Sequence, residues 1–179
     1  QALTLELRDD KEIALHLVKN DASNFECLSQ RLRDDREVVI ATTKGIKTGY
    51  RSLMQYISEE FRDDKEIVMG ALSLDKGDGY LFISDRLKED REVVELAVSL
   101  YGDNLQHVPE RFKNDKEIVL LAVKNREYSY KYASKEIKGL IQEDNPVKSL
   151  ETVINFEKLT KELKTIEVNT KAMPRKMKI

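Results

Sequence analysis

The sequence has no tryptophan, three prolines, seven glycines and a single cysteine, Cys27, in 179 residues. One cysteine cannot form a disulfide within the chain, and it implies no oxidising compartment. The small number of glycines and prolines argues against a turn-rich β sandwich. No apolar run approaches the roughly 20 residues that a membrane-spanning helix needs, so we expect no membrane span. These absences favour a helical fold.

An excess of charge of one sign is also lacking. The chain has 31 Lys and Arg residues against 33 Asp and Glu residues, a net charge of -2. A nearly neutral chain has no strong field to attract nucleic acid or an anionic membrane, so nucleic-acid binding is disfavoured. Charged residues nevertheless make up 36% of the sequence and hydrophobic residues 40%. This combination suits many exposed helix faces around a continuous core.

The sequence is built on a repeat. The residues LRDDKEI from Leu7 return as LRDDREV from Leu32 and as FRDDKEI from Phe61, and looser copies begin at Leu87 and Phe112. Successive copies start 25 to 29 residues apart. Self-similarity at such a period is typical of repeat architectures, in which each unit packs on the next.

Each copy is expected to begin a long helix at its first acidic position. A short polar side chain at a helix N-cap accepts a hydrogen bond from the first turn, and a Glu three residues later completes a capping box. The predicted caps are Asp9, Asp34, Asp63 and Asn114, with Glu89 as a weaker cap in the fourth copy. The acid that follows each cap would lie in the first turn, where the helix dipole favours negative charge.

Behind each predicted cap the sequence is mostly apolar. One position in this stretch holds mainly small residues, which would let neighbouring helices approach closely: Leu17, Thr42, Ala71, Ala97 and Ala122. A second, shorter helix is predicted from apolar pairs with i, i+3 spacing: Phe25/Leu28, Met54/Ile57, Tyr80/Ile83, Leu105/Val108 and Tyr130/Ala133. A Ser or Pro after each pair would start a new turn. One such unit cannot bury its own apolar face. The predicted fold class is therefore all-α, an α-solenoid of about five helix-pair repeats.

The pattern L-R-D-D-K/R-E-V/I, with a short helix and S-x-x-L after it, resembles the bacterial and protist repeat family known as domain of unknown function 4116. The resemblance covers residues 3 to 139. It implies tandem helical repeats, often within larger proteins that include secreted effectors of intracellular bacteria, and it implies no catalytic residues. The chain departs from the pattern at Glu89, at Asn114 and at the Thr42–Thr43 pair, which replaces apolar core residues.

We divide the chain into two parts. Residues 1–139 hold the tandem repeats, with a partial repeat at Leu3 and Leu5 before the first copy. Residues 140–179 hold a long amphipathic helix that begins at Asn145-Pro146, ends near Val168 and caps the array. Its predicted apolar face consists of Leu150, Val153, Ile154, Leu159, Leu163 and Ile166. The basic tail, residues 171–179, is expected to be frayed, with an anionic-surface contact as the alternative.

Little in the sequence points to catalysis. Capping explains the paired acids, and the basic column beside them is expected to form ion pairs, with a phosphate-binding surface as the alternative. That column is Arg8, Arg33, Arg62, Lys88 and Lys113. His16 is expected to be partly buried, and no signature supports a nucleophilic pair of Cys27 with His107. The loops at 45–49 and 75–79 lack the glycine pattern of a phosphate loop and the ligands of a calcium loop. We predict no catalytic residue, no metal site and no cofactor.

One column of the shorter helix varies in size and polarity where its neighbours stay apolar: Cys27, Tyr56, Phe82, His107 and Tyr132. Packing between repeats is the favoured interpretation of this column. The variation also suits a semi-exposed surface that a partner contacts, and in that case we predict Tyr56, Phe82, His107 and Tyr132 as partner-binding residues.

The predicted function is a protein–protein interaction scaffold, in its most specific form the targeting or regulatory part of a bacterial effector. The alternatives are a non-catalytic module of a larger enzyme and a nucleic-acid-binding helical repeat array. We expect the chain itself not to be an enzyme and its partner to be another protein, of host origin if the chain is an effector. Its expected location is the cytoplasm, or a host cell into which it is secreted.

Overall fold

A computed structural model describes residues 7–46 and 52–172, and every regular element within these ranges is a helix. The long helices are α1 (Lys11–Asn20), α3 (Arg36–Thr43), α5 (Lys65–Asp75), α7 (Arg91–Leu100) and α9 (Lys116–Asn125). The 3-10 segments are η1 (Leu7–Asp9), η2 (Ala22–Cys27), η3 (Leu53–Gln55), η4 (Asp78–Phe82), η5 (Gly102–Gln106) and η6 (Glu127–Tyr132). Short helices are α2 (Gln30–Arg33), α4 (Glu59–Arg62), α6 (Asp85–Lys88), α8 (Glu110–Lys113) and α10 (Lys135–Lys138), and α11 (Pro146–Ala172) follows them.

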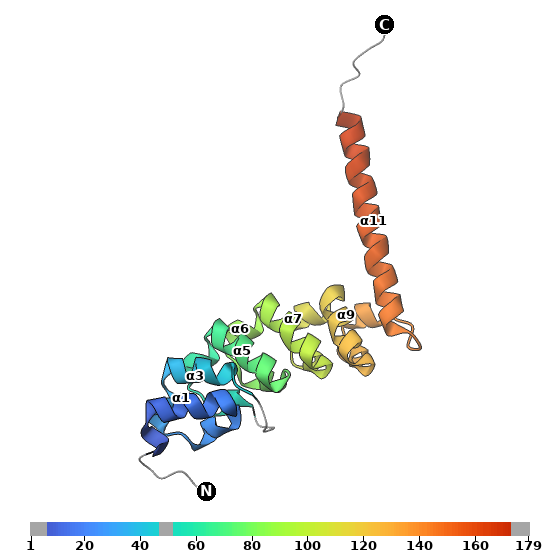
Figure 1. Ribbon diagram of the computed structural model, residues 1–179. Coiled ribbons are helices and arrows are strands. Elements are labelled where there is room, and N and C mark those ends of the chain that lie inside the picture. Colours follow the sequence, from blue (N-terminus) through green and yellow to red (C-terminus); the bar gives the residue numbers. More distant parts are fainter. Residues whose placement is uncertain (1–6, 47–51, 173–179) are drawn as a thin grey trace.

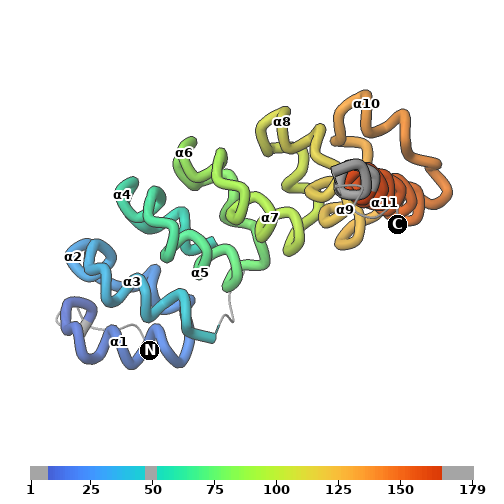
Figure 2. The backbone as a smooth tube through the Cα atoms, turned by 90° about the horizontal axis from the view of Figure 1, so that it is seen from above, coloured from blue at the N-terminus to red at the C-terminus, as the bar shows by residue number. Residues whose placement is uncertain are grey.

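The long helices stack in chain order. Each packs against the next, from α1 through α3, α5 and α7 to α9, and α11 packs against α9. The tube view shows the five long helices along one side of the array and the five short helices along the other (Figure 2). The core therefore runs continuously between the two rows, and α11 projects away from its far end (Figure 1).

The small residues predicted at the stacking position lie where neighbouring long helices meet. Ala71, Ala97 and Ala122 are fully buried. Thr42 is also fully buried, and its Oγ1 donates a hydrogen bond to the carbonyl oxygen of Val38 at 2.7 Å. Because this bond satisfies the hydroxyl inside the core, the second copy accommodates the polar residue.

The prediction of the helix caps is wrong by one residue. The second acid of each pair is the N-cap: Asp10, Asp35, Asp64, Asp90 and Asp115. The residues predicted as N-caps instead end the element that precedes each long helix. Four are C-caps of short helices, namely Asp34, Asp63, Glu89 and Asn114, and Asp9 ends η1. The long helix of the fourth copy thus has an Asp N-cap, Asp90, like those of the other copies. Glu89 does not weaken the start of this helix. The Glu that was expected to complete a capping box follows its cap by two residues, and its own N–H is bound by the cap in copies two to five.

The predicted shorter helix is two elements. Its apolar pair lies at a 3-10 segment, and the Ser or Pro that follows begins a separate short α-helix, as the sequence predicts for a new turn. In the first copy Leu28 and Ser29 both have extended backbones, and Ser29 Oγ accepts a hydrogen bond from the N–H of Leu32. These two extended residues prevent one continuous helix.

Helix α11 begins at Pro146 as predicted and continues past Val168 to Ala172. Its predicted single apolar face is wrong. Leu150 and Ile154 are buried, whereas Leu159 and Leu163 are 58% and 61% exposed. The physical reason is helix geometry: nine residues separate Leu150 from Leu159, and about 100° per residue places them on opposite sides.

Three further predictions lie outside the described residues. These are the partial repeat at Leu3 and Leu5, the Lys47 to Gly49 part of one loop, and the tail from residue 173.

Candidate partner-binding surface

The 3-10 segments position the predicted binding column. A 3-10 helix has three residues per turn, so residues at i and i+3 share a face. In η2 this inner pair is Phe25 and Leu28, which are 1% and 4% exposed. Cys27 lies between them and is exposed. The same spacing in the other copies turns Tyr56, Phe82, His107 and Tyr132 away from the inner pair. We call these five column residues the turn ridge.

The turn ridge is neither buried nor uniformly open. Cys27, Phe82 and His107 are exposed, and the exposed fraction of Phe82 is 38%. Tyr56 and Tyr132 are half-buried and pack against the edge of the core. Lys131 Nζ lies 4.7 Å from the centre of the Tyr132 ring, a cation–π distance. The ridge thus offers apolar and aromatic surface without being part of the core.

Sequence reasoning missed three exposed apolar residues in the same segments. Leu81, Tyr101 and Tyr128 are 52%, 41% and 73% exposed. Tyr101 precedes η5 and Tyr128 lies in η6, and these two segments pack on one another. Aligning the copies would have found Tyr128, because the other copies place Ser23, Ser52, Asp78 and Asp103 at its position.

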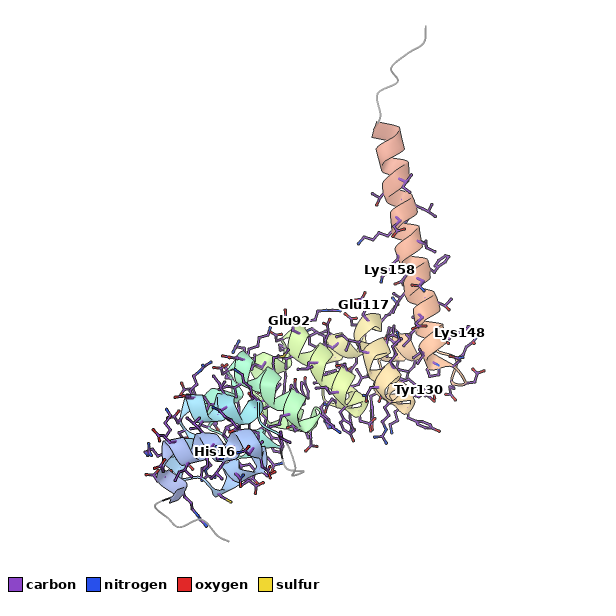
Figure 3. The ribbon with its side chains drawn as sticks, in the orientation of Figure 1. His16, Glu92, Glu117, Tyr130, Lys148 and Lys158 are labelled. Carbon is purple, nitrogen blue, oxygen red and sulfur yellow. The ribbon has the colours of Figure 1, made fainter. Side chains whose placement is uncertain are left out.

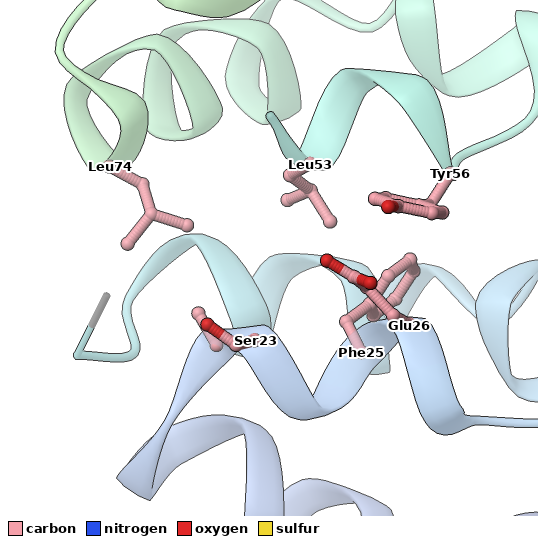
Figure 4. Close-up of a pocket in the computed structure, with 7 residues that line it drawn as sticks. Ser23, Phe25, Glu26, Leu53, Tyr56 and Leu74 are labelled. Carbon is pink, nitrogen blue, oxygen red and sulfur yellow. The ribbon is translucent and has the colours of Figure 1, made fainter. Parts of the chain in front are cut away.

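A small cavity lies beside Tyr56, between η2, η3 and the end of α5. Figure 4 shows the Tyr56 ring facing Phe25 and Glu26, with Leu74 and Ser23 at the other end of the cavity and Leu53 between the two ends. Its volume is about 20 Å³, room for about one water molecule. The cavity is therefore too small for an organic ligand, so the ridge offers a surface and not a binding pocket at this point.

Ion pairs between copies account for the acids at the long-helix starts. The first cation of α1, α3, α5 and α7 contacts the N-cap Asp and the following Glu of the next copy at 2.6 to 3.1 Å. These pairs are Lys11 with Asp35 and Glu37, Arg36 with Asp64 and Glu66, Lys65 with Asp90 and Glu92, and Arg91 with Asp115 and Glu117. We call this series the charge ladder. Figure 3 shows Glu92 and Glu117 along one edge of the array.

The charge ladder moves the pKa values of its aspartates and of its cations away from neutrality. The hydrogen bond from Lys65 holds the pKa of Asp90 below its usual value, and the same contact with Asp90 and Glu92 raises the pKa of Lys65. Lys11 lowers the pKa of Asp35 in the same way. Acid–base catalysis at neutral pH works best with a pKa near 7. The ladder aspartates and cations therefore stay charged near neutral pH, and their contacts join one copy to the next.

The basic column was expected to form ion pairs, and for its two lysines these pairs are local. Lys88 and Lys113 pair with Asp85 and Glu110 inside their own short helices. A second set of contacts connects the end of one short helix, or of η1, to the start of the next short helix, and it uses the acids first taken for caps. Asp9 binds Ser29 and Arg31, Asp63 binds Ser84 and Arg86, and Glu89 binds Arg111. This set explains why the first acid recurs although it caps no long helix.

A family model described as domain of unknown function (DUF4116) matches the chain in four overlapping segments, residues 10–50, 44–88, 76–108 and 90–138. Together the segments run from residue 10 to residue 138, well over half of the chain. The chain belongs to the DUF4116 family. No curated protein and no solved structure matches it.

Two of the DUF4116 segments coincide with structural boundaries. The segments 10–50 and 90–138 both begin at an N-cap, Asp10 and Asp90. Each includes two long helices with a 3-10 segment and a short helix between them. A DUF4116 segment of this length therefore holds one complete interface between copies, charge ladder included.

The other candidate sites in the DUF4116 repeats serve the fold. Within the described ranges, no three His, Cys, Asp or Glu side chains converge as metal ligands would. In the 75–79 loop, Asp75 is buried and accepts hydrogen bonds from Ser52 Oγ and from the N–H of Gly77. Gly77 has a φ of 88°, which suits glycine. The Asp75 carboxylate thus holds a turn.

The histidines and the cysteine are not brought together. Cys27 ends η2 and His107 follows η5, three copies further along the array. His16 is exposed on α1, where its ring lies 3.1 Å from the side-chain amide of Asn20. The expectation that His16 is partly buried is therefore wrong. No helix in the described ranges has the length and hydropathy that crossing a membrane requires.

Proposed function

We propose that this chain is a protein-interaction scaffold, an α-solenoid of five DUF4116 repeats that binds a protein partner along the turn ridge and is not itself an enzyme. The observation that carries the proposal is the regular succession of semi-exposed apolar and aromatic side chains on the 3-10 segments. Because these positions recur at a regular interval, they form an extended line of contact sites along the array. Helices pack about 10 Å apart, so five ridge positions extend over roughly 40 Å.

The chemistry of the ridge favours a protein partner. Aromatic and apolar side chains that fill pockets on a partner supply much of the energy at protein interfaces. Phe82 is exposed, and its chain neighbour Leu81, outside the ridge, is exposed as well, so the surface is most apolar at this point. Tyr56 and Tyr132 are held by the core edge, so they would lose little conformational entropy when a partner binds.

The charge ladder supports a protein partner over nucleic acid. Phosphate contacts need cations that are available to the ligand. Lys11, Arg36, Lys65 and Arg91 are each bound by two carboxylates of the next copy, so this row offers little charge for phosphates. The family's occurrence in secreted effectors makes a host protein the first partner class to test, with the host cytoplasm as the place of action.

The test compares ridge and non-ridge variants in quantitative affinity capture from a host-cell lysate. The ridge variant is Phe82→Ser with His107→Ser. The matched control is Leu140→Ser, which removes a side chain of similar exposure (41%) just after α10 and off the ridge. We expect at least one protein to be captured equally by wild type and control and about tenfold less by the ridge variant, as a loss of about 1.4 kcal/mol would give.

Equal capture by all three proteins would contradict the ridge as the binding site. Capture that disappears after nuclease treatment of the lysate would favour the nucleic-acid alternative. Circular dichroism of each variant checks that the helices are retained, since all three side chains are exposed and contribute little to the core.

A further inference from the structure

The side of α11 that faces away from the array is apolar and exposed. Phe156, Leu159 and Leu163 are 70%, 58% and 61% exposed, and Ile166 is 58% exposed. At about 100° per residue these four side chains lie within about 80° of one another around the helix axis, opposite the side that packs on α9. We call these four residues the α11 stripe. Large apolar side chains that lie together on a surface mark an interaction site.

The α11 stripe lies on the part of the helix that projects beyond the array (Figure 1). Phe156 follows Pro146 by ten residues, so the stripe begins about 15 Å along the helix. Among the described side chains, the last ion pair between α11 and the array joins Glu157 to Lys116 at 2.9 Å. Because the stripe faces away from α9, a flat surface can contact it without displacing a helix of the array.

The charge of this nearly neutral chain is unevenly distributed along the sequence. Residues 158–179 contain seven Lys and Arg residues and two Asp and Glu residues, a net charge of +5. Residues 1–157 contain the other 24 basic and 31 acidic residues, a net charge of -7. An anionic surface would therefore attract the projecting end of the protein and repel the array.

Three lysines place part of this positive charge around the α11 stripe. Lys158 and Lys164 lie on its two sides, each about 120° from its centre, and Lys161 lies opposite. All three are exposed, and none of them forms an ion pair among the side chains that the structure describes. Lys158 is labelled in Figure 3. Long lysine side chains can reach polar groups at a surface while the apolar side of their helix is buried.

These features distinguish the possible partners of the α11 stripe. The stripe spans residues 156–166, fewer than two heptads, whereas coiled-coil seams extend over about three or four, and two copies of α11 would bring their lysines together. A nucleic acid would attract the lysines but would not use the apolar side chains. A helix with lysines around an apolar stripe is typical of helices that bind the surface of an anionic bilayer.

We propose that α11 docks the chain on an anionic lipid bilayer. The α11 stripe enters the boundary between headgroups and acyl chains, and Lys158 and Lys164 contact the lipid phosphates. The helix lies in the plane of the surface, because only one side of its projecting part is apolar. The proposal goes beyond a scaffold that binds a protein, since it attaches the array to a membrane through its far end.

The first test measures sedimentation with vesicles. One set of vesicles is phosphatidylcholine with about one quarter phosphatidylserine, and the other is phosphatidylcholine alone. The stripe variant is Leu159→Gln with Leu163→Gln, because Gln favours a helix nearly as well as Leu does. The matched control is Tyr128→Gln with Leu140→Gln, which removes two side chains that are 73% and 41% exposed outside α11. We expect the stripe variant to bind anionic vesicles about tenfold more weakly than wild type or the control.

A second pair of variants tests the charge. The lysine variant is Lys158→Gln with Lys164→Gln, and its control is Lys19→Gln with Lys135→Gln, which removes the same charge from exposed positions of the array. Wild type and the control should bind anionic vesicles more tightly than neutral ones. The lysine variant should lose most of this difference, and added salt should reduce the difference for wild type.

The third test locates the contact. The chain contains no tryptophan, so Phe156→Trp introduces a single fluorescent probe on the α11 stripe. Its emission should shift to shorter wavelength when anionic vesicles are added, because the probe leaves water. The control probe is Tyr128→Trp in η6, at a side chain of similar exposure, and its emission should stay unchanged.

Four results would overturn the proposal. Wild type could fail to bind anionic vesicles. The stripe variant could bind them as tightly as wild type. The emission of the Phe156→Trp protein could stay unchanged while it is bound, which would place the contact elsewhere. The mass of wild type without vesicles could rise with concentration and that of the stripe variant could not, which would assign the stripe to a second copy. If circular dichroism shows that the stripe variant loses helix content, the Phe156→Trp protein decides, since it keeps an aromatic side chain at that position.

Discussion

Replacing Asp90 with alanine should destabilise the array more than replacing its neighbour Glu89. Asp90 Oδ1 accepts hydrogen bonds from the N–H groups of Glu92 and Val93, at 3.0 and 3.2 Å. Losing an N-cap of this kind costs about 1 kcal/mol. Asp90 also binds Lys65 at 2.8 Å, and losing this contact adds to the cost. Glu89 contributes an exposed ion pair with Arg111, worth about 0.5 kcal/mol or less.

The assay is urea unfolding together with amide hydrogen exchange in α7, since repeat arrays can open in parts. The Asp90→Asn variant separates the two effects, because Asn caps the helix but cannot form the ion pair. The expected order of stability is wild type, Glu89→Ala, Asp90→Asn and Asp90→Ala, with the second and third close together. A larger loss for Glu89→Ala than for Asp90→Ala would show that α7 begins one residue earlier. Equal losses for Asp90→Asn and Asp90→Ala would assign the whole effect to the ion pair.

Two further measurements test the contacts between copies. The charge ladder holds the pKa of Asp35 and of Asp90 below the unfolded value of about 3.9. The stability that these shifts supply is complete above that pH and is lost as the pH falls through the folded pKa values. An acid titration followed by circular dichroism should therefore show that Asp90→Asn loses less folding stability between pH 5 and pH 2 than wild type does. Replacement of the buried Asn104 by Ala should lower the free energy of unfolding in urea melts by about 1 to 3 kcal/mol. The reason is that its side-chain amide donates to the carbonyl oxygens of Gly77 and Ala97 at 2.8 and 3.1 Å. Replacement of the exposed Gln106 by Ala is the control and should cost about 0.5 kcal/mol or less.

Periodicity made the fold class predictable. The recurring acidic motif, the small stacking residues and the apolar pairs all repeat at one period, and stacked helical units produce such a period directly. The position of the turn ridge followed from the same alignment, because a column between two constant apolar positions points away from both. Whether a partner uses the ridge depends on that partner and is not encoded in the period.

The helix caps were not predictable from local sequence. Most copies offer two adjacent short polar residues before the long helix, and either one satisfies the local rules for capping. The choice depends on residues 20 or more positions away: Ser84 and Arg86 bind Asp63, which leaves Asp64 to cap α5. The two sides of α11 were missed for a related reason. Its apolar residues were assigned to one face, although only Leu150 and Ile154 are buried there.

The charge ladder also gives the array a polarity. Each rung has its cation in one copy and its two carboxylates in the next, and no rung within the described ranges runs the other way. Copies can therefore be added only in one orientation, with the cation of one copy facing the two carboxylates of the next. A duplicated stretch of 25 residues brings both halves of the joint with it. Such an array can change length in evolution by unequal recombination without inventing a new interface.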